Sequence, residues 1–496
     1  MNARQVVVVG YGMAGARFAE EVRRRDPDAT RVALTVLGAE AHPAYNRVLL
    51  SGVLAGSLTQ DAVRLHDDTW AERQRVDLRT GLAAQRIDVG GRKVELADGG
   101  VLGYDALVLA TGSRAWVPPT EGLLDGSGAL ADGVAVFRTL DDCRRILAAA
   151  RPGAPVAVLG GGLLGLEAAR GLAGRGHPVT VVHPVDHLME RQLDVGCGRV
   201  LARTLGRLGI AVRLNVRATR HVPGRGLVLS DGSEVPAELV VVSAGVRAET
   251  GLAVAAGLAV DRGVLVDDEL RTSDEHVRAI GDCAQHAGTA GGLVQPAWDQ
   301  AAVLADLLTG ADPAARYRGT PVVTRLKARD VDLAALGDVH VDVDEPDAEV
   351  LCLQDPSRGR YAKLVLRDER VAGAIVLGAP DAAATITQLY DRGAPAPSDR
   401  LALLLGRALP AGGAASPADL PSSALVCRCN TVTKGQLVTA WRAGACGVAA
   451  LRETTRASTG CGSCETTVRG IADWLARTEP AAKTATATTS SGRAAS

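Results

Sequence analysis

Short apolar runs that lead into glycine recur along the chain, and each is typical of a buried parallel strand. The first, residues 6–9, leads into Gly10-Tyr11-Gly12-Met13-Ala14-Gly15, and a helical pattern over 16–25 follows. In such a turn the first glycine lets the strand turn sharply, the second lets the backbone approach a pyrophosphate, and the third lets helix and strand pack closely. Strand, loop and helix together predict a dinucleotide cradle, although a glycine-rich turn can also serve packing alone.

The same pattern returns later in the chain. Residues 156–159 form a second apolar run before Gly160-Gly161-Gly162-Leu163-Leu164-Gly165. A helix start that contains Glu167 comes next, and a strand-like run over 179–183 follows it. A second loop in the same strand-to-helix context predicts a second dinucleotide cradle.

Two further features lie at matching distances in the two units. The Asp-Gly hairpin turn at 98–99 recurs at 231–232, and the strand that ends at Gly112 recurs as a strand that ends at Gly245; both offsets are 133 residues. The two glycine loops are 150 residues apart, so the units differ by one internal insertion or deletion. Because packing alone does not explain the duplication of a whole unit, the sequence predicts two related dinucleotide-binding units.

Charged side chains follow several of these strands. Glu40 lies just after the second predicted strand, where a βαβ unit presents an acid to the ribose of an adenosine, and an exposed loop carboxylate is the alternative. Arg47, in an irregular segment over 42–51, is placed to meet a phosphate. Asp282 follows a third strand that ends in glycine, where it would reach a bound cofactor.

Length and composition narrow the class of protein. A chain of 496 residues allows about three domains. The net charge of -1, from 55 basic and 56 acidic residues, gives no overall field that would attract nucleic acid or an anionic membrane. No apolar stretch is long enough to span a membrane, and the N-terminal valine run is too short for a signal peptide, so a cytoplasmic location is expected.

The cysteines are concentrated near the C-terminus. Four of the nine form a Cys-x-Cys and a Cys-x-x-Cys pair: Cys427, Cys429, Cys461 and Cys464. Such a set can bind an iron-sulfur cluster or zinc, or form a redox disulfide pair, and the tight Cys-x-Cys spacing favours a 2Fe-2S cluster. The other five are expected to be small buried apolar residues: Cys143, Cys197, Cys283, Cys352 and Cys446.

On these motifs, residues 1 to about 405 resemble the two-dinucleotide flavoprotein reductases, a group that includes NADH-dependent ferredoxin, rubredoxin and nitrite reductases. The resemblance implies FAD on the first unit, with Asp282 bonded to its ribityl chain, and NAD(P)H on the second. The predicted cofactor-binding residues of the first unit and its return segment are Gly10, Gly12, Met13, Ala14, Gly15, Glu40, Arg47, Ala110, Thr111, Gly112, Gly281 and Asp282. Those of the second unit are Gly160, Gly162, Leu163, Leu164, Gly165, Glu167, His183 and Gly245.

The resemblance also implies an α/β fold in which the second of two Rossmann-like domains is inserted into the first, followed by an α+β domain and a small helical 2Fe-2S domain. The implied boundaries are 1–115 and 246–318 for the FAD-binding domain, 116–245 for the NAD(P)-binding domain, 319–405 for the α+β domain and 424–478 for the 2Fe-2S domain. The Pro, Gly, Ala and Ser content of residues 406–423 predicts a linker, and residues 479–496, rich in Ala, Thr and Ser without a core-forming pattern, are expected to be a disordered tail.

The sequence departs from the family pattern in two places. His183 ends the strand where an acid would favour NADH and an arginine NADPH, so the choice of coenzyme is open. Arg47 is not followed by the lysine that ferredoxin reductases place near the flavin. In addition, residues 1–142 contain no cysteine, so the thiol relay of the disulfide reductases is not expected, and no catalytic acid or base is assigned.

Residues 425–478 resemble the bacterioferritin-associated-ferredoxin-like 2Fe-2S domain, which implies that the four paired cysteines ligate the cluster. A flavoprotein followed by this domain resembles the reductase portion of NAD(P)H nitrite reductase large subunits and the electron-transfer subunit of assimilatory nitrate reductase. The chain has no second four-cysteine group for a siroheme-linked 4Fe-4S centre. We therefore expect electrons to pass from NAD(P)H through FAD and the 2Fe-2S cluster to a separate nitrate or nitrite reductase or another redox acceptor.

Two alternatives remain. The first is a ferredoxin or rubredoxin reductase of an oxygenase system, whose cluster passes electrons to a small carrier. The second is a redox-sensing or docking module for an iron-storage or regulatory partner.

Overall fold

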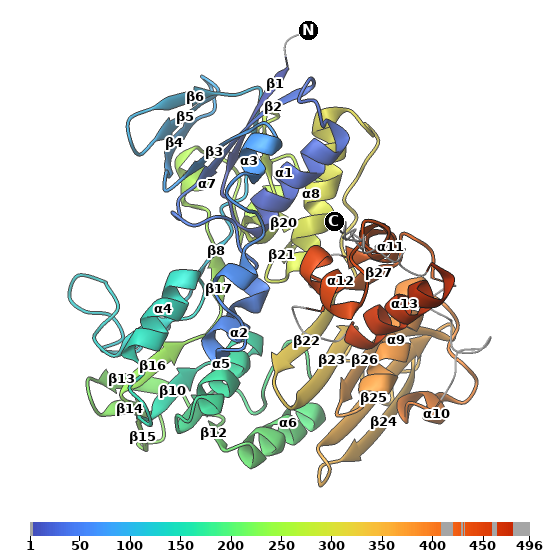
Figure 1. Ribbon diagram of the computed structural model, residues 1–496. Coiled ribbons are helices and arrows are strands. Elements are labelled where there is room, and N and C mark those ends of the chain that lie inside the picture. The colour runs from blue at the N-terminus through green and yellow to red at the C-terminus, as the bar shows by residue number, and fades with distance from the viewer. Residues whose placement is uncertain (1–2, 408–419, 428–429, 431, 459–463, 480–496) are drawn as a thin grey trace, which may run out of the picture. The chain divides into compact units, whose positions relative to one another are not determined.

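The computed structural model describes residues 3–407, 420–427, 430, 432–458 and 464–479 (Figure 1). The chain divides into two compact units, residues 1–408 and 409–496. Most of the predicted linker over 406–423 and of the predicted tail over 479–496 lies outside the described residues.

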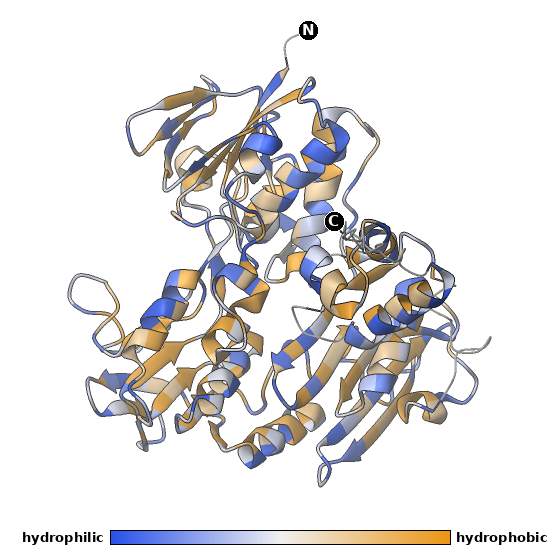
Figure 2. Ribbon diagram, in the orientation of Figure 1, coloured by the Kyte–Doolittle hydropathy of each residue, from blue (hydrophilic) through white to orange (hydrophobic). Residues whose placement is uncertain are grey.

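The first unit begins with a five-stranded parallel sheet of order β19-β7-β1-β2-β3. These strands are β19 (Val277–Ala279), β7 (Ala106–Leu109), β1 (Arg4–Val9), β2 (Val32–Gly38) and β3 (Val76–Thr80). Helices α1 (Met13–Arg25) and α8 (Val294–Thr309) pack against each other beside it. The valines of β1 are buried because both faces of this sheet are covered, and Figure 2 shows its strands as apolar.

A second five-stranded parallel sheet has the order β12-β11-β10-β16-β9. Its strands are β12 (Ile210–Arg213), β11 (Val179–Val182), β10 (Val156–Leu159), β16 (Leu239–Val242) and β9 (Val134–Val136), and its helices are α4 (Leu140–Ala149), α5 (Leu163–Gly174) and α6 (Val195–Arg207). In both sheets the central strand leads into a glycine loop and has, on one side, the strand that ends just before Gly112 or Gly245. The predicted pair of Rossmann-like units is confirmed.

Smaller antiparallel elements accompany the two sheets. They are β4 (Ala84–Asp88), β5 (Lys93–Leu96) and β6 (Val101–Gly103); β13 (Ala218–Val222), β14 (Gly226–Leu229) and β15 (Glu234–Pro236); and β18 (Val264–Val266), β20 (Ala284–His286) and β21 (Thr289–Ala290), where β18 and β20 are parallel. The two predicted Asp-Gly hairpins are β5–β6 and β14–β15. Strands β8 (Ser113–Ala115) and β17 (Val246–Ala248) pair antiparallel where the chain enters and leaves the second sheet's unit.

The third part of the large unit is an antiparallel sheet of order β22-β23-β26-β25-β24 with two helices. Its elements are β22 (Val323–Ala328), β23 (Val331–Gly337), β24 (Glu349–Asp355), β25 (Arg360–Arg367), β26 (Arg370–Leu377), α9 (Pro380–Arg392) and α10 (Arg400–Leu404). Leu326 and Ile375 of this sheet share a buried core with Leu166 and Leu201 of α5 and α6. The third domain is therefore packed onto the second Rossmann-like unit.

The small C-terminal unit contains β27 (Leu425–Cys427), β28 (Val432–Thr433), α11 (Lys434–Arg442), α12 (Val448–Thr455) and α13 (Glu465–Thr478). Leu437, Leu451, Val468 and Leu475 form its core. Thr433 caps α11 with a reciprocal hydrogen-bond pair to Gln436. This unit thus has a hydrophobic centre of its own.

Some expectations about local structure were wrong. The segment over 42–51, expected to be irregular, contains a short 3-10 helix, Arg47–Leu49, and the start of α2 (Leu50–Ala55), which packs on α5. Cys352 and Cys446, expected to be buried, are exposed. The remaining helices of the large unit are α3 (Trp70–Arg73), α7 (Gly251–Ala255) and the 3-10 helices Asp61–Val63 and Gly281–Cys283. Among the described residues, no helix has the length and apolar character needed to cross a membrane.

Candidate functional site

The two glycine loops have nearly the same geometry. Gly10 and Gly160 each have a φ of +118°, a conformation that favours glycine. A Cβ on Gly10 would lie 2.1 Å from the carbonyl oxygen of Ala110, and one on Gly160 would lie 2.2 Å from that of Ser243. Each glycine therefore allows a close approach between its loop and the neighbouring strand end, as a dinucleotide cradle requires.

The second and third glycines of each loop also fit this interpretation. A Cβ on Gly15 would lie 1.9 Å from the Gly10 carbonyl oxygen, and one on Gly165 would lie 2.0 Å from that of Gly160. By contrast, a Cβ on Gly162 would meet no described atom within 4 Å. The outer side of that loop is therefore open to an approaching group.

Helix N-termini supply the donors at both loops. Met13 and Ala14 begin α1, and Leu163 and Leu164 begin α5. Neither helix, both of which the structure describes in full, has an acidic residue in its first turn. Their free N–H groups and dipoles therefore suit a phosphate anion.

Arg47 and Glu40 form an ion pair next to the first loop. The Arg47 guanidinium donates to the Glu40 carboxylate, which also accepts the Tyr45 hydroxyl at 2.6 Å. A Cβ on Gly12 would have the Arg47 guanidinium as its nearest neighbour, at 3.9 Å. The structure thus places the Arg47 guanidinium beside the first loop, paired with a Glu40 carboxylate that is held by two donors.

Asp282 lies in a polar cluster at the carboxyl ends of the first sheet's strands. The Ser113 hydroxyl donates to Asp282 Oδ2 at 2.7 Å, and the Arg138 guanidinium donates to the same oxygen. Its neighbour Gly281 donates its backbone N–H to the Gln300 side chain at 2.7 Å. The Asp282 side chain is 16% exposed, so the cluster holds a fixed carboxylate that solvent still reaches.

The strand ends beside the loops are tied together by hydrogen bonds. Ala110 donates its backbone N–H to Val9, and the Thr111 hydroxyl donates to the Glu249 carbonyl at 2.7 Å. The carbonyl of Gly112 accepts the N–H of Glu249, and Gly245 accepts that of Trp116. These bonds place the Ala110-Thr111-Gly112 turn and its counterpart at Gly245 beside the β8–β17 pair.

Glu167 has a partner in the third domain. This carboxylate is 2% exposed and accepts both the Lys327 side-chain ammonium, at 2.8 Å, and the Lys327 backbone N–H, at 3.0 Å. A buried charge needs such a partner because desolvation is costly. Glu167, for which the sequence predicts a role in coenzyme binding, links α5 to β22 in the structure.

His183 follows β11 and is buried. Its Nδ1 accepts the backbone N–H of Gly161 at 3.1 Å, and its Nε2 lies 3.1 Å from a carboxylate oxygen of Glu190. The hydrogen bond with His183 lowers the pKa of Glu190 below its ordinary value. The end of β11 thus presents a carboxylate that the sequence did not indicate.

Two of the four predicted cluster ligands lie within the described residues. Cys427 and Cys464 are both buried, and the hydrogen bond from the Cys464 thiol lowers the pKa of Cys427 below its ordinary value. Asn430 and Ser458 direct polar groups at the two sulfur atoms. The thiolate is the metal-binding form, so this pair suits a metal centre. Cys429 and Cys461 lie outside the described residues.

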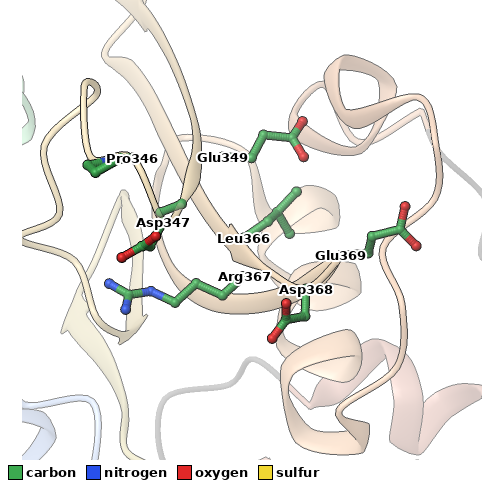
Figure 3. A pocket seen from close by; sticks show the side chains of 8 residues that line it. Pro346, Asp347, Glu349, Leu366, Arg367, Asp368 and Glu369 are labelled. Atoms are coloured by element: carbon green, nitrogen blue, oxygen red, sulfur yellow. The ribbon is translucent and has the colours of Figure 1, made fainter.

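A groove of about 590 Å³ lies elsewhere, in the third domain (Figure 3). It is lined at the start of β24 and at the β25–β26 turn by eight residues, four of them acidic: Pro346, Asp347, Ala348, Glu349, Leu366, Arg367, Asp368 and Glu369. None of these belongs to either glycine loop or to the cysteine pairs.

Comparison with known proteins agrees with this geometry. A family model described as pyridine nucleotide-disulphide oxidoreductase matches residues 4–301, more than half of the chain. The chain belongs to this family. Two further models match: the rubredoxin NAD+ reductase C-terminal domain over residues 322–394 and the BFD-like [2Fe-2S] binding domain over residues 425–474.

Two curated relatives of this family member come from Bacillus subtilis strain 168. Nitrite reductase [NAD(P)H] is 35% identical and covers 95% of this chain, and the assimilatory nitrate reductase electron transfer subunit is 32% identical and covers 97%. The chain spans 58% and 61% of their respective lengths. The crystal structure of the ferredoxin reductase of the CYP199A2 system from Rhodopseudomonas palustris is 27% identical, with a TM-score of 0.67 over 75% of this chain and 91% of that one.

Family membership gives this pyridine nucleotide-disulphide oxidoreductase FAD and a nicotinamide coenzyme, and the BFD-like domain gives it a 2Fe-2S cluster. The residues present fit these groups. Each glycine loop is a cradle that a Cβ would fill, and each opens onto a helix N-terminus. The thiols of Cys427 and Cys464 are donors of the kind that iron-sulfur clusters use.

Three charged residues of this family member could not be found from the sequence: Arg138, Glu190 and Lys327. Arg138 is 144 residues from Asp282, and Lys327 is 160 residues from Glu167, so no local pattern relates them. Glu190 is only seven residues from His183, but its role depends on which nitrogen of the imidazole carries the proton. Glu190 could be recognised only once the fold of the loop between it and His183 is known.

Proposed function

We propose that this chain is an NAD(P)H-dependent flavoprotein oxidoreductase that passes electrons from NAD(P)H through FAD and a 2Fe-2S cluster to a separate nitrate or nitrite reductase. The observation that carries the proposal is the combination of two built dinucleotide loops in one compact unit with a buried pair of thiols in another. The similarity to the two Bacillus proteins over nearly the whole chain supports the nitrogen-assimilation role.

The residues of the large unit suit hydride transfer because they would bind the two cofactors and orient them toward each other. The first loop, with Arg47, would hold the FAD pyrophosphate, and Asp282, fixed by Ser113 and Arg138, would accept hydrogen bonds from its ribityl hydroxyls. The second loop would hold the nicotinamide coenzyme. When bound, the flavin supplies the conversion between two-electron and one-electron chemistry. No side chain is required as acid or base, and positioning is the protein's main contribution.

An anaerobic titration of the purified full chain tests this proposal. NADH and NADPH are added separately, and the visible absorbance of flavin and cluster is followed. We expect at least one coenzyme to bleach both chromophores at near-stoichiometric amounts. If neither coenzyme bleached either chromophore, the proposal would be wrong.

A cysteine variant tests the route of the electrons. Cys464→Ala should abolish electron transfer to a protein acceptor while ferricyanide reduction, which the flavin alone supports, is retained. The matched control is Cys446→Ala in the same unit, because Cys446 is exposed and outside the paired motifs. Equal loss in the two variants, or full transfer by Cys464→Ala, would contradict a role for the cluster.

The match of residues 322–394 to the rubredoxin NAD+ reductase C-terminal domain favours one alternative acceptor, a small carrier such as rubredoxin or ferredoxin. The discriminating measurement compares the rates at which the NAD(P)H-reduced protein reduces a rubredoxin, a ferredoxin and a siroheme nitrite reductase protein. A higher rate with the nitrite reductase supports the proposed role, and a higher rate with a carrier supports the alternative.

A further inference from the structure

The identity of the coenzyme depends on what faces the adenosine ribose at the end of β11. In Rossmann-like units this is where an acid accepts the ribose hydroxyls or an arginine meets a 2′-phosphate. Here the position holds His183, and its Nδ1 accepts the Gly161 N–H. Because Nδ1 accepts, the proton of the neutral ring is on Nε2, and Nε2–H donates to Glu190 Oε2 at 3.1 Å.

The segment that carries Glu190 is built onto the glycine loop. Met189, next to Glu190, is fully buried and donates its backbone N–H to the Gly161 carbonyl at 3.0 Å. Its φ of +55° is uncommon for a residue other than glycine, which marks a segment shaped by its contacts. A Cβ on Gly161 would lie 2.5 Å from the buried Leu188 side chain. The glycine loop and the Glu190 segment therefore fit each other closely.

The charges near this position favour a neutral hydroxyl over a phosphate. The Glu190 side chain is 34% exposed, and its hydrogen bond with His183 favours the carboxylate form. Arg213, which ends the adjacent strand β12, is directed to the β14–β15 hairpin, where it donates to Asp231 at 3.1 Å and to Ser233 at 2.8 Å. Arg191, which follows Glu190 in the chain, is exposed, and its positive charge also favours the carboxylate form of Glu190.

We propose that Glu190, positioned by His183, selects NADH over NADPH. The carboxylate accepts hydrogen bonds from the ribose hydroxyls of NADH and repels the 2′-phosphate of NADPH. The inference rests on the proposed function in one respect, that the second glycine loop holds the nicotinamide coenzyme. It extends that function by assigning the specificity to a residue outside the strand end.

Binding of two unreactive probes tests the assignment. ADP-ribose and 2′-phospho-ADP-ribose are titrated by calorimetry into the purified full chain. We expect ADP-ribose to bind at least about tenfold more tightly, as a hydrogen-bonded carboxylate of this kind implies. Glu190→Gln should remove most of this preference. Glu234→Gln, at an exposed carboxylate of the same domain, should keep it.

The role of His183 is tested by rescue. His183→Ala should weaken ADP-ribose binding and raise the KM for NADH without changing kcat, whereas His183→Gln, whose amide can still donate to Glu190, should restore much of the affinity. Flavin content and melting temperature identify any variant that has lost its fold. Glu190→Ala provides a second variant at the selecting position.

The outcomes separate this inference from the proposed function. If the unsubstituted protein bound 2′-phospho-ADP-ribose as tightly as ADP-ribose, or if Glu190→Gln and Glu190→Ala both kept the preference, the assignment of Glu190 would be overturned. Failure of both coenzymes to bleach the chromophores would instead contradict the proposed electron transfer, even if ADP-ribose bound with the expected preference.

Discussion

At the scale of single residues, Arg138 is the cation that forms a hydrogen-bonded ion pair with Asp282. It begins the segment before α4, yet its guanidinium reaches the carboxylate that follows the last strand of the first sheet. Its backbone N–H and that of Thr139 both donate to Asp142 Oδ2, so the backbone from which the arginine side chain extends is held in place. A residue from one Rossmann-like unit thus completes a polar cluster of the other.

Arg138→Ala should weaken FAD retention about tenfold, because the Asp282 carboxylate, which would accept the ribityl hydroxyls, loses the charged hydrogen bond, about 1.5–3 kcal/mol, that fixes its position. The measurement is the ratio of flavin to protein after extensive dialysis, with the dissociation constant from flavin fluorescence. Arg225→Ala is the control, since Arg225 is exposed and pairs with Glu234 at the surface. Unchanged flavin affinity in Arg138→Ala would show that Asp282 does not depend on this partner.

The single cysteines should differ in reactivity. Burial raises the pKa of Cys143 to about 12 and also raises the pKa of Cys197 and Cys283, so these thiols stay protonated and covered. Iodoacetamide at pH 8 should therefore modify the exposed Cys352 and Cys446 in the native protein, and the other three only after denaturation. Peptide mass spectrometry gives the result, and rapid native labelling of Cys143 would contradict it.

Residues of the site could be predicted where the requirement is local. The glycines at 10 and 160 were recognisable because their φ of +118° and the close neighbouring carbonyls exclude a side chain, whatever the rest of the chain does. The partners Arg138 and Lys327 were not recognisable, because their roles arise only when segments 144 and 160 residues apart are packed together.

At the scale of elements, the two glycine loops are alike in shape and should differ in what they bind. Gly10→Ala and Gly160→Ala each place a Cβ within 2.2 Å of a backbone oxygen, so each loop must shift. We expect Gly10→Ala to lose flavin. Gly160→Ala should keep its flavin, but the rate at which the coenzyme reduces that flavin should fall at least about a hundredfold, because binding of the coenzyme phosphates depends on the loop backbone.

The comparison needs a glycine whose replacement is harmless. Gly126 is suitable, since a Cβ there meets no described atom within 4 Å. Absorbance spectra report bound flavin, and stopped-flow bleaching reports its reduction. Loss of flavin from Gly160→Ala together with retention in Gly10→Ala would reverse the assignment of the two cofactors.

The ion pair between Glu167 and Lys327 joins the second Rossmann-like unit to the third domain. Lys327→Met should lower the free energy of unfolding by about 3–5 kcal/mol, because it leaves a buried carboxylate without its cation. Chemical denaturation measures the change. The double variant Lys327→Met/Glu167→Gln should recover part of the lost free energy of unfolding. If the loss in the double variant instead equalled the sum of the losses in Lys327→Met and Glu167→Gln, the two residues would not be coupled.

Elements were predictable from sequence where they are long and periodic. The apolar runs of β1 and β10, each leading into a glycine loop, and the helical pattern of α1 are signals that few alternatives share. Helix α2 was missed because its six residues are too few to show a helical period and include a glycine. It is stabilised by packing on α5, a contact that the local sequence does not contain.

At the scale of the whole molecule, the duplication could be predicted from the sequence, because the strand, glycine loop, hairpin and second strand end recur in the same order in both units. The two compact units, 1–408 and 409–496, have separate cores. A single unfolding transition is therefore not expected. The small unit should draw much of its stability from its metal centre, as small metal domains do.

Removal of iron by a chelator under reducing conditions should lower the melting temperature of the small unit and leave that of the large unit, with its flavin, within about 2 °C. Differential scanning calorimetry resolves the two transitions, and iron analysis confirms the removal. A Cys464→Ala variant should show the lowered transition without the chelator. An equal shift of both transitions would contradict independent units.

The pairing of β7 with β19 also sets an order of events during synthesis. Strand β7 receives its outer neighbour, β19, only when Val277 has been made, 170 residues after its partner Leu107. The whole of the second sheet, which ends at Val242, is available before then. The second Rossmann-like unit can therefore finish folding on the ribosome while the first sheet still has a bare, apolar edge at β7, which is prone to wrong pairing. A pause in translation between residues 243 and 277 prolongs that exposure.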